Sequence, residues 1–100
     1  MNMAQIGKFK VSLQIKDTKS GKRQTLEGFV SFEKEKGQYG NGVTMVVEGL
    51  GEPFEVQGYD LRYDTDFHKE KPIQYIADWY TNKFSAQRFV LTGMSISEAE

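Results

Sequence analysis

The densest group of side chains that could do chemistry lies between residues 60 and 70. It combines four carboxylates with the single histidine of the chain: Asp60, Asp64, Asp66, His68 and Glu70. Alternate residues of an extended segment share one side, so residues 64–70 could present oxygen ligands to a hard divalent cation. The glycine and the terminal glutamate of a calcium-binding loop do not occur at the required offsets. We therefore predict no metal site and interpret the group as a solvated loop whose negative charge complements the N-terminus of a following helix.

Other catalytic arrangements lack the residues that they need. A pair of His68 with Asp64 or Asp66 could move a proton, but a lone histidine in a polar loop is ordinary. The chain has no cysteine, which excludes a disulfide, a thiolate nucleophile and a cysteine zinc site. The glycine-rich segment 37–42 has neither the Lys-Ser/Thr pair nor the following helix of a phosphate loop, so we predict a hairpin loop with Tyr39 at its tip. The residues predict a protein that is not an enzyme and holds no cofactor.

The charge is distributed in opposed blocks. Residues 1–23 carry six basic side chains and one acid, whereas residues 24–60 carry two basic side chains and seven acids. The net charge of -1 argues against a protein that binds duplex DNA. A basic first hairpin beside an aromatic ring on an open sheet face still has the chemistry of a surface for single-stranded nucleic acid. The candidate residues are Phe29 for stacking and, for the phosphates, Lys8, Lys10, Lys16, Lys22 and Arg23.

Two aromatic residues of the predicted helix, Tyr75 and Trp79, project away from its apolar stripe. Either they pack against the segment 59–67, which we favour because small domains need their large side chains for the core, or they are exposed and bind a partner. In the exposed case Arg62 and Lys83 would be their charged neighbours. The other candidates for protein interaction are Tyr39 and two residues expected opposite one another on the outer sheet face, Phe29 and Val46.

The clearest predicted strand covers residues 8–16, where apolar and polar side chains alternate strictly. The polar run 17–23 predicts a turn, and the renewed alternation over 25–33 predicts an antiparallel partner. The register that we expect pairs Phe9 with Phe32, Val11 with Val30, Leu13 with Gly28, and Ile15 with Leu26. It also places Lys8 opposite Glu33 and Gln14 opposite Glu27, so that cross-strand pairing neutralises part of the basic face.

Two further strands are predicted over 43–48 and 54–57, and a change of phase at Gly58 indicates a bulge or a strand end. Pro72 suits the first turn of a helix that should end near residues 82–85. Residues 88–96 predict a last strand with Gly93 as a candidate bulge. The apolar stripe of the helix is predicted to consist of Ile73, Ile76, Ala77, Tyr80 and Phe84.

These elements predict an α+β fold in the order ββββαβ, in which a four-stranded antiparallel meander is followed by one helix and a fifth strand. The helix should pack on one face of a curved sheet and return the last strand beside the first, giving the spatial order 4-3-2-1-5. We expect one domain over residues 1–100, with fraying of residues 1–6 and 97–100.

The absence of a catalytic arrangement predicts a small cytoplasmic protein that works by binding. We expect protein–protein interaction, with self-association into a homodimer as one form of it. The alternative is a module for single-stranded nucleic acid. Neither duplex DNA nor a membrane is an expected partner, since the longest apolar runs are far too short to span a bilayer.

Overall fold

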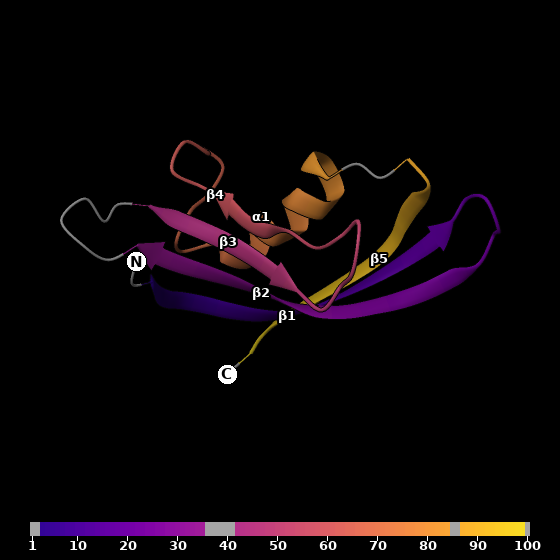
Figure 1. Ribbon diagram of the computed structural model, residues 1–100, viewed down its shortest axis with the longest axis horizontal. Helices are drawn as coiled ribbons and strands as arrows, with labels where there is room; N and C mark the ends of the chain where they lie inside the picture. The colour runs from indigo at the N-terminus through magenta and orange to yellow at the C-terminus, as the bar shows by residue number, and fades with distance from the viewer. Residues whose placement is uncertain (1–2, 36–41, 85–86, 100) are drawn as a thin grey trace.

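The sheet is built on a long antiparallel ribbon of two strands (Figure 1). The computed structural model describes residues 3–35, 42–84 and 87–99. The two strands of the ribbon are β1 (Met3–Asp17) and β2 (Arg23–Glu35). The shorter strands β3 (Val43–Glu48) and β4 (Gln57–Asp60) continue the sheet beyond β2, and β5 (Phe89–Glu98) pairs with the other side of β1. All pairs are antiparallel, and the strand order β4-β3-β2-β1-β5 confirms the predicted topology.

The helical segment between β4 and β5 covers one face of this curved sheet (Figure 1). It begins as the α-helix α1 (Pro72–Asp78) and continues as a π-helical turn, η1 (Trp79–Lys83). Pro72 occupies the first turn of α1, where its missing N–H costs no hydrogen bond. The element order ββββαβ is therefore confirmed.

The core lies between the sheet and the helix. Within each strand every second side chain points into this core, because successive side chains of a strand alternate between the two faces of the sheet. Its buried sheet residues are Phe9, Val11, Leu13, Ile15, Val30, Phe32, Val43, Met45 and Val47. The helix and loops contribute Leu50, Phe54, Leu61, Tyr75, Ile76, Trp79 and Tyr80.

The register of β1 against β2 differs from the predicted one by two residues. Val11 lies opposite Gly28 and Leu13 opposite Leu26, and the predicted pairs were wrong throughout. The turn decides the register, because the Asp17 carboxylate accepts hydrogen bonds from the N–H groups of Lys19 and Ser20 and closes the hairpin early. A shift by two keeps every side chain on its face, so the buried set of β1 was still predicted correctly.

The same shift changes the neighbours of the polar side chains on the outer face. Lys8 lies opposite Ser31 and not opposite Glu33, and Gln14 lies opposite Thr25 and not opposite Glu27. The cross-strand charge pairing that we predicted is therefore absent from these positions.

Two glycines interrupt the ladders where the sequence indicated irregularities. The β3–β4 register shifts at Gly58, whose φ of 118° is accessible to glycine, and the β1–β5 register shifts next to Gly93, where Thr92 is the additional residue. The strand predicted over 54–57 lies later in the chain, over Gln57–Asp60. The strands also extend into the predicted fraying segments, since β1 begins at Met3 and β5 ends at Glu98.

The buried face of the helix is rotated from the predicted stripe. Ile73 is 39% exposed, whereas Tyr75 and Trp79 are buried together with Ile76 and Tyr80. The helix packs against the loop between β4 and α1 as well as against the sheet, which buries a second row of side chains. The widening of the helix into η1 also ends the regular 3.6-residue period on which the stripe was based.

Candidate functional site

The predicted chemical group between residues 60 and 70 does not line one side of an extended segment. Residues 61–71 form successive turns, with backbone hydrogen bonds from Asp64 to Leu61, from Phe67 to Asp64 and from Lys71 to His68. His68 is exposed, and within the described ranges no three metal-ligating side chains come together. The predicted alignment of residues 64–70 along an extended segment was therefore wrong, because the turns interrupt the alternation of the side chains.

Asp64 instead joins this loop to the helix. Its carboxylate accepts hydrogen bonds from the Tyr75 hydroxyl and from the Lys83 ammonium, each at 2.6 Å, and Lys83 also lies 3.3 Å from Asp66. Burial by itself would raise the pKa of Asp64, but the hydrogen bonds from Lys83 and Tyr75 outweigh it and hold the pKa below its usual value. Burial, followed by the hydrogen bond to Asp64, raises the pKa of Tyr75.

Tyr75 and Trp79 pack inside the molecule, as the favoured alternative predicted. The Trp79 ring lies 4.4 Å from that of Tyr59, and the Tyr75 ring lies 5.3 Å from that of Phe67. The exposed fraction is 2% for Tyr75 and 9% for Trp79. Their candidacy as exposed partner-binding residues is thereby corrected, because the 59–67 segment covers both rings.

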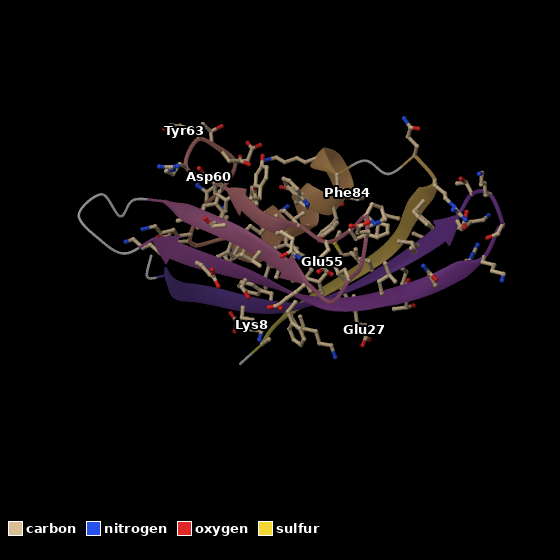
Figure 2. The ribbon with its side chains drawn as sticks, in the orientation of Figure 1. Lys8, Glu27, Glu55, Asp60, Tyr63 and Phe84 are labelled. Carbon is tan, nitrogen blue, oxygen red and sulfur yellow. The ribbon has the colours of Figure 1, made fainter. Side chains whose placement is uncertain are left out.

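A hollow of about 580 Å³ lies between this segment and the π-helical turn. Its lining residues are Tyr59, Asp60, Tyr63, Asp64, Thr65, Trp79 and Lys83. Tyr63 stands at its rim with 89% of its surface exposed, on the side of the sheet that carries the helix (Figure 2). Sequence reasoning missed Tyr63 and Thr65 as site residues, although the alternation of Tyr59, Leu61 and Tyr63 placed two tyrosines on one side.

The outer face of the sheet carries most of the candidates for nucleic acid binding. Phe29 is 38% exposed, lies opposite Lys10, and has the Lys8 ammonium 4.8 Å from its ring centre. Figure 2 shows that Lys8 and Glu27 project from this face, away from the helix. Lysines and glutamates are therefore mixed here, with Glu48 opposite Phe29 on β3.

The other candidates of the basic hairpin lie farther along the ribbon. Lys16 pairs with Arg23 at its end, and Lys22 lies in the exposed turn. Val46 is half-buried and lies opposite Ser31, so the predicted direct pair of Val46 with Phe29 was wrong. Tyr39 lies outside the described residues.

The free side of β5 is a third surface. In the described part of the chain no strand pairs with this side of β5, and residues 89–97 contain no charged side chain. Val90 is 49% exposed, and a groove of about 350 Å³ runs beside the start of the strand. The groove is lined by Phe54, Tyr80, Thr81, Phe84, Phe89, Val90 and Leu91.

The fold and these surfaces define a small α+β domain with one antiparallel sheet and one covering helix. Comparison with protein-family models, with curated proteins and with solved structures found no match. Among the described residues no helix has the length and apolar character needed to cross a bilayer.

Proposed function

We propose that this protein is a small non-enzymatic binding protein that acts through protein–protein contact and forms a homodimer through the free edge of β5. The observation that carries the proposal is the free edge of β5, whose residues 89–97 carry no charged side chain. An exposed edge presents unpaired N–H and C=O groups, and proteins that stay monomeric usually protect such edges with charges, proline or short strands. The described part of β5 has ten residues and carries its one charge at Glu98.

The side chains of β5 also favour a defined pairing with a second copy. Ser95 lies opposite Ser12 on the outer face, while Met94 and Ile96 lie opposite Leu13 and Val11 and are only partly buried. Antiparallel pairing of two β5 strands about Ser95 would place Met94 of each copy opposite Ile96 of the other. Apolar pairs of this kind stabilise sheets, and this symmetric pairing brings no like charges together. The bulge beside Gly93 limits the pairing to the second half of the strand.

Cross-linking tests this pairing directly, because the chain has no cysteine. A single Ser95→Cys substitution can form a disulfide only between copies, and the two sulfurs would meet at the twofold axis. We expect rapid oxidation to a covalent dimer, and a dimer mass for the unmodified protein in sedimentation equilibrium. The matched control is Ser20→Cys in the exposed hairpin turn, which should oxidise slowly. A monomer mass, or equal oxidation rates for the two variants, would contradict the proposal.

A second function, binding of single-stranded nucleic acid, is favoured by the arrangement of Lys8 and Lys10 around the exposed Phe29 ring. Stacking on an aromatic ring beside cationic side chains is how such proteins hold bases and backbone. Titration of a fluorescent oligonucleotide should then show an affinity that falls steeply with salt. Phe29→Ala should weaken binding, while Ile73→Ala on the helix side should not. Absence of binding at low salt would remove this function.

A further inference from the structure

The hollow between the β4–α1 loop and η1 has features of a ligand site that neither proposed binding surface uses. Its base is aromatic, because the rings of Tyr59 and Trp79 pack together at 4.4 Å. Tyr63 adds a third ring at the rim, and the Arg62 guanidinium lies 5.9 Å from its centre. A volume of about 580 Å³ falls within the range of small-molecule sites.

The π-helical turn brings part of this lining together. Trp79 and Lys83, the first and last residues of η1, both face the hollow, whereas Tyr80 and Thr81 line the groove on the other side. Such turns are rare and frequently occur at functional sites. The indole N–H of Trp79 is also buried without an acceptor among the described residues.

The charged groups around the hollow are already paired. The Asp60 carboxylate accepts hydrogen bonds from the guanidinium and the backbone N–H of Arg62, and Lys83 lies between Asp64 and Asp66. A phosphate would meet two cations that already pair with three carboxylates, and a cationic ligand would have to displace Arg62 or Lys83 from those carboxylates. Carboxylate oxygens and an ammonium nevertheless retain capacity for further hydrogen bonds to neutral groups.

We infer that this hollow binds a neutral sugar. A sugar ring has an apolar face of C–H groups, which can lie on the exposed Tyr63 ring. Its hydroxyl groups both donate and accept hydrogen bonds, and so match a rim in which Asp60 and Asp64 accept while Thr65 and Lys83 donate. The ligand class follows from an aromatic lining combined with charged groups that already pair with one another.

The test uses Trp79, the single tryptophan of the chain, as the reporter. The probes are glucose, galactose, mannose, N-acetylglucosamine and their common disaccharides, with inorganic phosphate and tetramethylammonium as probes of the other ligand classes. We expect a saturable change of Trp79 fluorescence with at least one saccharide. Tyr63→Ala should weaken that binding by about threefold to tenfold, since the lost ring contact is of the size of an aromatic pair.

Two controls make the result decisive. Tyr63 is almost fully exposed, so its variant should keep the far-ultraviolet circular dichroism of the original protein. Phe29→Ala removes an exposed aromatic from the opposite face and should leave saccharide affinity unchanged. The inference is overturned if no saccharide gives a saturable signal, if only phosphate or tetramethylammonium does, or if Tyr63→Ala binds as tightly as the original protein.

Discussion

At the residue scale, Asp64 connects the loop after β4 to the helical segment. Its carboxylate, which is 10% exposed, accepts from Tyr75 and Lys83, residues that lie 11 and 19 positions later in the chain. A partly buried hydroxyl that lost this acceptor would be left unsatisfied, which costs more than the net gain from an ordinary hydrogen bond. One ionised side chain therefore helps to hold the loop against the helix beside the hollow.

The free energy of unfolding should respond to pH through Asp64. Its folded pKa lies below the unfolded value of about 3.9, so its stabilising contribution is complete above that pH and is lost as the pH falls through the folded pKa. We expect Asp64→Asn to lower the free energy of unfolding by about 1–3 kcal/mol at neutral pH. Urea titrations of both proteins should show this difference shrinking toward pH 2. A difference that is constant with pH would contradict the assigned role of the charge.

At the element scale, Gly28 allows the turn after β3 to cross β2. A Cβ atom at this position would lie 2.6 Å from the Glu48 carbonyl oxygen and 2.9 Å from the Leu50 nitrogen. Both are backbone atoms, so the turn itself would have to move. Gly93 in β5 is different, because its closest neighbour would be the flexible end of the Gln14 side chain.

These two glycines form a matched pair of tests. Gly28→Ala should lower the free energy of unfolding by about 1–3 kcal/mol, the usual cost of forcing atoms into a packed site. Gly93→Ala should change it by less than about 0.5 kcal/mol, since Gln14 can rotate away. Chemical denaturation measures the free energy of unfolding of both variants. A loss for Gly28→Ala as small as that for Gly93→Ala would show that the turn after β3 adjusts easily.

At the scale of the whole molecule, the sheet is elongated and ends in a free edge. The principal extents are 50 × 27 × 23 Å, because the β1–β2 ribbon projects beyond the part that the helix covers (Figure 1). Arg88 supports that projection by pairing with Asp17 at 2.7 Å, and this hydrogen-bonded pair lowers the pKa of Asp17. The unpaired side of β5 is left for a second copy in the proposed dimer.

Self-association through β5 should make thermal stability depend on protein concentration. A partner that binds only the folded state raises the midpoint of unfolding as its concentration rises. We expect the midpoint of the original protein to increase with concentration. Ser95→Lys would place two ammonium groups together at the twofold axis, so its midpoint should stay constant. The control Ser20→Lys should behave like the original protein, and an equal concentration dependence for both variants would argue against the β5 interface.

Much of the fold could be predicted because alternation has a short, local period. It identified the inward residues Phe9, Val11, Leu13 and Ile15, and its change of phase located the irregularity at Gly58. The bulge beside Gly93 was predicted from the glycine itself. Chain connectivity and the single helix then determined the strand order.

The tertiary structure decided what a period-two pattern leaves undetermined. A two-residue shift leaves the faces unchanged, so the β1–β2 register depended on how Asp17 closes the turn. Whether Tyr75 and Trp79 were buried depended on where the 59–67 segment lay, which is a matter of packing between residues distant in the chain. The hollow arises from the same packing. The sequence by itself determined which strand side chains face the core, and only the tertiary contacts decided which helix side chains are buried and which polar side chains meet.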